Sequence, residues 1–346
     1  MTGLEKEIGA FLTERGAVSV GFATRETLAG GPPSADITYM LPEARSVVSF
    51  ILPMERDPIR DHLGKKDYLA NERDHIEKTM ESGYISKDLA KWLEEKGHRS
   101  ARVFGNVSYR KIENEGGEIR LHPDLSHRYM AVASGAGSFG WSGNVGVKGY
   151  GTAVILGSVV TSAELEPTPP LPPEDSFCDN CKICASSCPS GMFHKKEEMS
   201  ISMGGVTFTH GARVNYTLCA LVCGGHTGLH KSGKWSSWSP GRYAISEDRK
   251  EIGDTFTRAT QNSEKWPKRE VPSGFTNPGG REINLTCGQC QIICWGNKED
   301  TSENYRLLVS SGCVIQRPSG KIDVLPPDDA AAEFEQMDPQ HRDLYR

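Results

Sequence analysis

The chain has 346 residues, 37% of them hydrophobic and 25% charged, with a formal net charge of −5. This length suits two domains or one large domain with an appended module, and the mild acidity gives no reason to expect nonspecific nucleic-acid binding. The longest apolar run, residues 153–160, is too short to cross a bilayer, and the N-terminal stretch lacks a basic and apolar export signal. We therefore expect a cytoplasmic protein with no membrane segment.

The first half of the chain alternates between helical and strand patterns. Gly16 is a plausible stop for the first helix, and Gly83 is expected to break a later one. Helical patterns cover residues 4–15, 67–96 and 124–134, and strand patterns cover 18–22, 46–52, 101–104 and 150–160. This alternation predicts an α/β or α+β domain over residues 1–165.

Composition divides the rest of the chain. Residues 166–173 contain five prolines and predict a stiff linker. The weak periodicity of residues 190–285 predicts irregular structure wrapped over a site. Residues 301–346 should form a C-terminal extension, and its acidic tail after Pro326 should contain a surface helix at 328–337.

Four cysteines follow the linker with the spacing C-x2-C-x2-C-x3-C-P, at Cys178, Cys181, Cys184 and Cys188. This run is the bacterial ferredoxin signature for [4Fe–4S] clusters, in which the fourth cysteine ligates the other cluster. A structural zinc site is the alternative, but zinc sites use paired C-x2-C units. The spacing therefore favours iron–sulfur clusters. The ten cysteines are expected to be metal ligands in a reducing compartment and not disulfides.

A second run, Cys287, Cys290 and Cys294, supplies the partner half. The crossing rule gives the first cluster Cys178, Cys181, Cys184 and Cys294, and gives the second Cys188, Cys287 and Cys290. The second cluster then lacks one ligand. Cys219 and Cys223 are the candidates, with Cys219 favoured, whereas Cys313 is expected to be a small buried apolar residue.

The segment from Gly135 to Gly140 matches G-x-G-x-x-G. A nicotinamide site would need a strand before this motif and a helix after it. A helical pattern precedes it instead, which disfavours that interpretation. Glycine also lets backbone approach a ligand closely, and a large flat cofactor would use such a surface.

A resemblance accounts for this order of motifs. The segment from Ala133 to Asn144, the Gly157-Ser158 strand, the proline-rich approach and both cysteine runs together resemble the group that joins epoxyqueuosine reductases and reductive dehalogenases. The resemblance covers roughly residues 1 to 300. It implies an α+β fold: a nitroreductase-like, cobalamin-binding domain over 1–165, then a ferredoxin-like module with two [4Fe–4S] clusters over 174–300, and an extension over 301–346.

The resemblance also implies site residues and partners. Base-off cobalamin would be held by the glycine-rich segment and the following strand: Gly135, Gly137, Phe139, Gly140, Trp141, Ser142, Gly143, Asn144, Gly157 and Ser158. The side chains expected over cobalt are Asp124, His127, Arg128 and Tyr129. His122 is a further candidate with a surface alternative, and His226 and His230 would cap the pocket or simply be exposed. A ferredoxin or flavodoxin would donate electrons, and a homodimer is the oligomeric state to consider.

Two departures bear on the substrate. Trp295 directly follows the second cysteine run, where the family has proline, and Leu121 lies where epoxyqueuosine reductases carry a proton-donating aspartate. These differences predict a dehalogenase-like reductase of a small organic molecule, in which organohalides are one class and tRNA is an unlikely substrate. Two alternatives remain: an epoxyqueuosine reductase acting on tRNA, and an electron-transfer or corrinoid-reducing protein without a substrate of its own.

Overall fold

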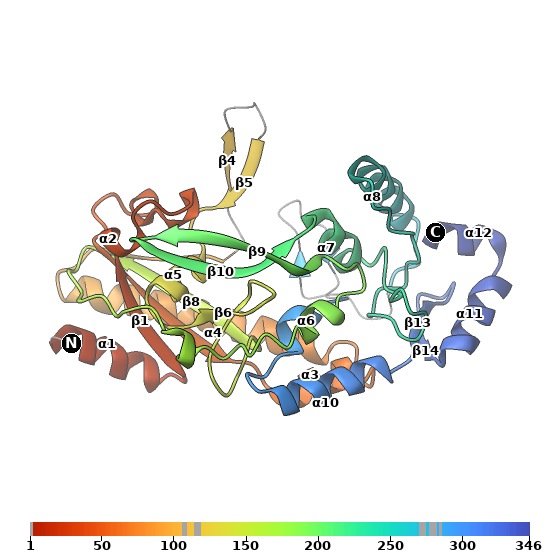
Figure 1. Ribbon diagram of the computed structural model, residues 1–346, viewed down its shortest axis with the longest axis horizontal. Helices are drawn as coiled ribbons and strands as arrows, with labels where there is room; N and C mark the ends of the chain where they lie inside the picture. The colour runs from red at the N-terminus through yellow and green to blue at the C-terminus, as the bar shows by residue number, and fades with distance from the viewer. Residues whose placement is uncertain (1–2, 106–108, 114–118, 270–274, 277–281, 284–285) are drawn as a thin grey trace.

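A four-stranded antiparallel sheet forms the centre of the N-terminal part. The computed structural model describes residues 3–105, 109–113, 119–269, 275–276, 282–283 and 286–346. The strands lie in the order β1-β2-β8-β3. Their bounds are β1 (Ser19–Thr24), β2 (Ser46–Pro53), β8 (Val154–Thr161) and β3 (Ser100–Arg102). With its helices, this sheet makes a mixed α and β architecture (Figure 1).

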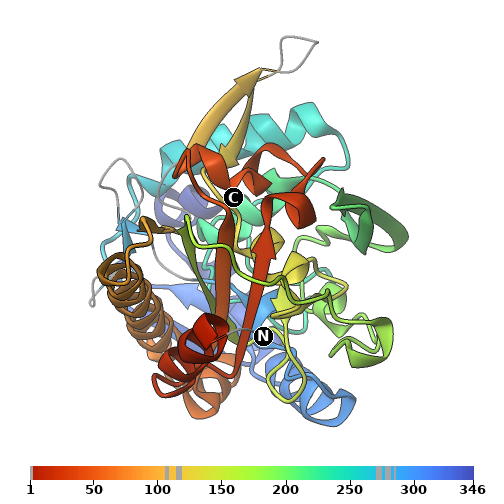
Figure 2. The same ribbon diagram turned by 90° about the vertical axis from the view of Figure 1, so that its left-hand side faces the viewer.

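Both faces of the sheet are covered. Strand residues alternate in direction, so Val48 and Phe50 face one side and Val47 and Ile51 the other. The first side packs against α1 (Gly3–Thr13) and α4 (Ala70–Glu95), and the second against α5 (His127–Ala133) and α2 (Arg25–Leu28) (Figure 2).

The helix predicted to break at Gly83 does not break there. α4 runs without interruption from Ala70 to Glu95, and α3 (Arg56–Leu63) is separate from it. Burial of Ile85, Leu89 and Leu93 against the sheet stabilises this helix and outweighs the cost of about 1 kcal/mol for glycine in a helix interior.

The short strand β3 leaves part of the sheet edge open. β3 pairs only with residues 159–161 of β8, whereas residues 154–157 of β8 pair with β2 alone among the described strands. The start of β8 therefore borders space between α4 and α5.

Residues 166–173 hold the chain against the sheet domain. The Glu166 backbone N–H donates to Glu5 Oε1 (2.8 Å), and the Thr168 N–H donates to the carbonyl of Phe22 (2.9 Å). The predicted linker is thus a strap along the surface, ending in η3 (Pro173–Asp175).

The expectation of irregular structure over residues 190–285 is wrong. This segment contains the hairpin β9 (Phe193–Met203) and β10 (Val206–Arg213), followed by α7 (Tyr216–Cys223) and α8 (Arg249–Ser263). The hairpin reaches across the sheet domain (Figure 1), and buried Met203 joins its core. Cross-strand packing and one apolar end stabilise a hairpin whose strands are otherwise mostly polar.

The C-terminal elements lie at the far end of the molecule from the N-terminus (Figure 1). Helix α10 (Lys298–Val309) packs against α3, and α11 (Pro327–Gln336) confirms the predicted tail helix. Cys313 is buried in a small apolar cluster, as expected. The remaining elements are η1 (Pro33–Ala35), η2 (Ile37–Tyr39), β4 (Tyr109–Glu113), β5 (Ile119–Pro123), β6 (Ser138–Phe139), β7 (Val145–Gly146), α6 (Ile183–Ser186), β11 (Phe275–Thr276), β12 (Glu282–Ile283), α9 (Gln289–Ile292), β13 (Cys313–Gln316), β14 (Ile322–Leu325), α12 (Pro339–Arg342) and η4 (Asp343–Tyr345).

Candidate functional site

Four thiols from the two cysteine runs line one cavity: those of Cys178, Cys181, Cys184 and Cys294. The first run curves around this cavity because Asn180 and Lys182 adopt left-handed backbone conformations, at φ 58° and 59°. The Trp141 backbone N–H donates to Cys178 Sγ (3.4 Å). We call these four residues the first cysteine group.

Five further cysteines form the second cysteine group: Cys188, Cys219, Cys223, Cys287 and Cys290. Each of the thiols of Cys188, Cys219 and Cys287 lies near enough to Cys290 for its charge to act there. Cys219 and Cys223 lie one turn apart on α7, with their Sγ atoms 3.7 Å apart. The Cys223 thiol lowers the pKa of Cys219 to about 7, so of these two Cys219 is the readier thiolate.

Burial favours the protonated form of Cys181 and Cys184 in the first group. It raises the pKa of Cys184 to about 12 and that of Cys181 to about 11. Such thiols are neutral on their own at pH 7, and a bound metal is what would hold them as thiolates. Within the described residues, no three His, Cys, Asp or Glu side chains are placed to hold a single metal ion.

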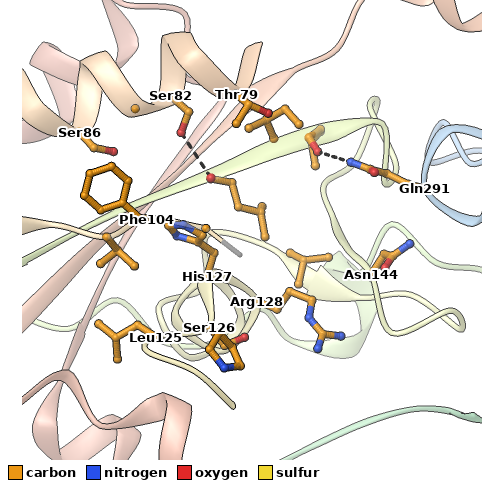
Figure 3. A pocket seen from close by; sticks show the side chains of 18 of the residues that line it. Thr79, Ser82, Ser86, Phe104, Leu125, Ser126, His127, Arg128, Asn144 and Gln291 are labelled. Atoms are coloured by element: carbon orange, nitrogen blue, oxygen red, sulfur yellow. Dashed lines mark hydrogen bonds between the residues drawn. The ribbon is translucent and has the colours of Figure 1, made fainter. Parts of the chain in front are cut away.

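A separate cavity of about 400 Å³ lies beside the start of β8, which β3 does not pair with. This size lies within the range of about 300–1,000 Å³ typical of ligand pockets. Thr79, Ser82, Gly83 and Ser86 of α4 line one wall, and His127 and Arg128 of α5 line another. Figure 3 shows Thr79, Ser82 and Ser86 across the cavity from His127 and Arg128, with Asn144 and Gln291 at one side.

Apart from His75, the residues of α4 that line the cavity are small. Gly83 lines the cavity, and a Cβ at this position would have no atom within 4 Å. A glycine in the middle of a helix lowers stability. A ligand that packs closely against Gly83 would explain why this position is glycine. Sequence reasoning missed this wall, and the signal was present: Gly83 was interpreted as a break although apolar residues continued in helical register beyond it.

The cavity directly adjoins both cysteine groups. Asn144 lines it, and its Nδ2 donates to Cys290 Sγ (3.6 Å). Gln291, which follows Cys290, also lines it and donates to the carbonyl of Val154 (2.9 Å). Thr152 lines both this cavity and the one formed by the first cysteine group. Only a few side chains therefore separate the cavity from the thiols.

The four side chains expected over cobalt divide into two pairs. His127 and Arg128 line the cavity, whereas Asp124 and Tyr129 are absent from its lining. Tyr129 packs against the sheet core, and burial raises its pKa. His122 also lies outside the lining, on β5. The roles of all five remain predictions.

Most of the glycine-rich segment faces protein atoms. A Cβ on Gly135 would lie 2.2 Å from the Pro169 carbonyl of the strap, and one on Gly157 would meet the Phe50 ring. Asn144 is the one predicted cofactor-binding residue that lines the 400 Å³ cavity, while Gly140, Trp141 and Ser142 line the first cysteine group's cavity. The Ser158 hydroxyl and His127 Nδ1 share a hydrogen bond (2.8 Å).

His226 and His230 are not on a helix, because α7 ends at Cys223. His226 is buried among Tyr243, Phe256 and Trp266. His230 stacks on Trp235 at 4.7 Å. Neither lines the 400 Å³ cavity.

The buried imidazole of His127 predicts a pH effect on stability. Burial lowers the pKa of His127 from 6.5 to about 4, so as the pH falls from 6.5 the unfolded chain takes up the proton first. The resulting loss of stability is absent above pH 6.5 and grows down to pH 4. Between pH 7 and pH 4.5 the free energy of unfolding should fall less in His127→Gln than in the wild type. We expect a difference of about 2 kcal/mol, measured by urea unfolding. Ser158→Ala keeps the imidazole and should keep the wild-type pH dependence; equal slopes for all three proteins would contradict the assignment.

Comparisons with known proteins agree with this layout. An epoxyqueuosine reductase of Gloeobacter violaceus is 25% identical over 178 residues, which are 51% of this chain and 49% of the relative. A catabolic reductive dehalogenase in complex with 3-bromo-4-hydroxybenzoic acid aligns with 98% of this chain and 37% of its own, at a TM-score of 0.51 and 14% identity. The structure of an epoxyqueuosine reductase with an epoxyqueuosine-modified tRNA stem loop aligns with 98% of this chain and with 74% of its own chain. The TM-score is 0.42 and the sequence identity is 16%.

No family model matches the chain. The chain spans about half the length of the curated relative that it matches. The chain is similar to epoxyqueuosine reductases and reductive dehalogenases, and it shares a fold with the dehalogenase. The curated relative is named an epoxyqueuosine reductase, so it gives no support to the expectation that tRNA is an unlikely substrate. In the described part of the chain, no helix is both long and apolar enough to span a membrane.

Proposed function

We propose that the chain is an oxidoreductase in which two [4Fe–4S] clusters deliver electrons to a corrinoid bound at the 400 Å³ cavity. The observation that carries this proposal is the contact between the cavity and both cysteine groups, through Asn144, Gln291 and Thr152. The finer architecture, a nitroreductase-like domain followed by a ferredoxin-like module, belongs to the same proposal.

The cysteine groups fit clusters by the chemistry of their donors. Four thiols around one cavity are the ligand set of a [4Fe–4S] cluster, and they are those of the first cysteine group. In the second group, Cys188, Cys287 and Cys290 would act together with Cys219. The Cys223 thiol would then donate a hydrogen bond to Cys219 (Sγ to Sγ 3.7 Å).

The cavity fits part of a large flat ligand. Its α4 wall of small residues, with open space at Gly83, leaves room for a ring system. A complete corrinoid is larger than the cavity and would extend past its mouth. When bound, it would supply a low-potential metal centre for reductive chemistry. The chain's own tasks are to bind it, orient it and supply protons.

The order of the relay follows from the position of the second cysteine group beside the cavity wall. All eight proposed ligands are partly buried, but Cys290 of the second group accepts a hydrogen bond from Asn144, which lines the cavity (3.6 Å). An external ferredoxin or flavodoxin would therefore reduce the first cluster, and the second would pass electrons on.

The proposed reaction replaces a halogen of a small organic molecule by hydrogen. It consumes two electrons and one proton per carbon–halogen bond, and a halide leaves. His127 is neutral at pH 7 because burial lowers its pKa, and Ser158 orients its ring at Nδ1 (2.8 Å). The remaining ring nitrogen could hold or relay a proton at the cavity. Arg128 places a positive charge beside it, suited to an anionic substrate group.

Epoxyqueuosine in tRNA is the second candidate substrate, since the curated relative is an epoxyqueuosine reductase. Anaerobic protein reconstituted with iron, sulfide and cobalamin distinguishes the candidates. We expect iron–sulfur absorption near ~400 nm, a corrinoid band, and bromide release from 3-bromo-4-hydroxybenzoate. Turnover of an epoxyqueuosine-modified tRNA stem loop alone would select the second candidate. Cluster absorption without corrinoid binding would instead indicate an electron-transfer protein.

A further inference from the structure

The loop of residues 142–144 separates the second cysteine group from the cavity, and two arginines hold it. Arg213 Nη2 donates to the Ser142 carbonyl (2.7 Å), and Arg128 Nη1 donates to the Gly143 carbonyl (2.8 Å). Asn144, the next residue, donates to Cys290 Sγ (3.6 Å). We call Arg128 and Arg213 the guanidinium pair.

The guanidinium pair places two positive charges in a partly buried region. Within the residues that the structure describes, no carboxylate forms a salt bridge with either arginine, and both side chains are at least partly buried. Burial lowers the pKa of Arg128, and the neighbouring Arg213 lowers it further. The rings of Phe193 (5.7 Å) and Tyr216 (5.2 Å) face Arg213 and offset only part of its charge. Two adjacent cations in such a place call for an anion.

The second cysteine group adjoins the guanidinium pair through two contacts. Asn144, which follows the two residues that the pair holds, donates to Cys290 Sγ (3.6 Å), and Arg213 lies over the ring of Tyr216 (5.2 Å), the first residue of the helix α7 that carries Cys219. A cluster held by four thiolates carries a net negative charge, and this charge grows by one unit on reduction.

We propose that the guanidinium pair is the counter-charge of the second cluster and sets its reduction potential. The inference rests on the proposed function, because it requires that clusters are present. Positive charge stabilises the more negative, reduced form and so raises the potential. A raised potential draws electrons from the first cluster toward the cavity side. Arg213 acts here as a positioning and tuning residue, through the cluster.

Redox titration followed by electron paramagnetic resonance tests this inference on the reconstituted full chain. Arg213→Gln should lower the reduced-to-oxidised ratio of the second cluster about tenfold at a fixed potential, which is a shift of about 59 mV to a lower midpoint. The first cluster should shift less. Arg213→Lys keeps the charge and should restore the wild-type midpoint.

Arg15→Gln is the matched control. Arg15 also donates to a backbone carbonyl, that of Phe11 (2.8 Å), and lies over the Phe11 ring at 3.6 Å, but it is located just after α1, which ends at Thr13. Both midpoints should stay at the wild-type values in this variant. If Arg213→Gln loses the second cluster, retention by Arg213→Lys supports a need for charge.

Two results would overturn the inference: unchanged midpoints in an Arg213→Gln protein with full iron content, or loss of the second cluster from both Arg213 variants. Failure of the proposed function has a different signature, because wild-type protein would then contain no cluster signal at all.

Discussion

Serine at Cys219 is expected to remove the second cluster and lower the iron content of reconstituted protein from about eight to about four atoms per chain. Cys219 shares its surroundings with Cys188, Cys287 and Cys290, and its pKa is lowered to about 7. A serine hydroxyl is a far weaker ligand than a thiolate. Iron and sulfide analysis, together with paramagnetic resonance of the reduced protein, measures the loss.

Two matched variants separate the candidate ligands. Cys223→Ser should keep about eight iron atoms, since its role is to donate a hydrogen bond to Cys219, and Cys184→Ser should lose the first cluster while keeping the second. If Cys223→Ser loses the iron and Cys219→Ser keeps it, the ligand assignment is wrong. If neither loses it, the two cysteines replace one another.

Sequence spacing predicted which cysteines lie together. The crossing rule grouped Cys294 with the first run and Cys188 with the second; the structure places Cys294 in the cavity of the first run and Cys188 near Cys287. Their roles as cluster ligands remain predictions. Spacing could not choose between Cys219 and Cys223, because residues four apart on a helix share a face and both thiols point to the same group. Such a choice depends on sub-ångström placement of side chains around a cluster.

The cavity was harder to predict than the cysteines. Its lining comes from α4, α5, β8 and the residue after Cys290, which are far apart in the chain. The glycine-rich segment matches a motif and therefore predicted a cofactor surface. In the structure, Gly135 leaves room for the Pro169 carbonyl and Gly157 leaves room for the Phe50 ring. Close approach by the protein itself and close approach by a ligand leave the same glycine signal in a sequence.

Regular structure in the long insertion was also missed. The signal was present in strands β9 and β10: Met199, Ile201 and Met203 alternate with serines up to Gly204-Gly205, and Val206 and Phe208 alternate with threonines after it. Their register is set by pairing with one another and by Met203, which packs into the sheet domain. The insertion also supplies Arg213 and Cys219, so it brings ligands and charge to the second cysteine group.

Leucine at Gly83 is expected to block corrinoid binding while leaving the fold intact. The new side chain would enter open space on the α4 wall of the cavity. Helix propensity favours leucine over glycine by nearly 1 kcal/mol, so the melting temperature should hold or rise. We expect the dissociation constant for hydroxocobalamin, measured by absorbance titration, to increase at least about tenfold, which is about 1.4 kcal/mol.

Gly253→Leu is the matched control, because Gly253 also lies within a helix, α8, with no atom within 4 Å of a Cβ. This variant gains the same helix propensity without entering the cavity, so its cobalamin affinity should equal that of the wild type. Gly83→Ala should fall between the two, since one methyl group occupies little of the space. Equal affinity in Gly83→Leu and wild type would place the corrinoid elsewhere, and the small-residue wall would then belong to the substrate. Iron content serves as an independent check in all three variants, because the α4 wall does not touch the thiols.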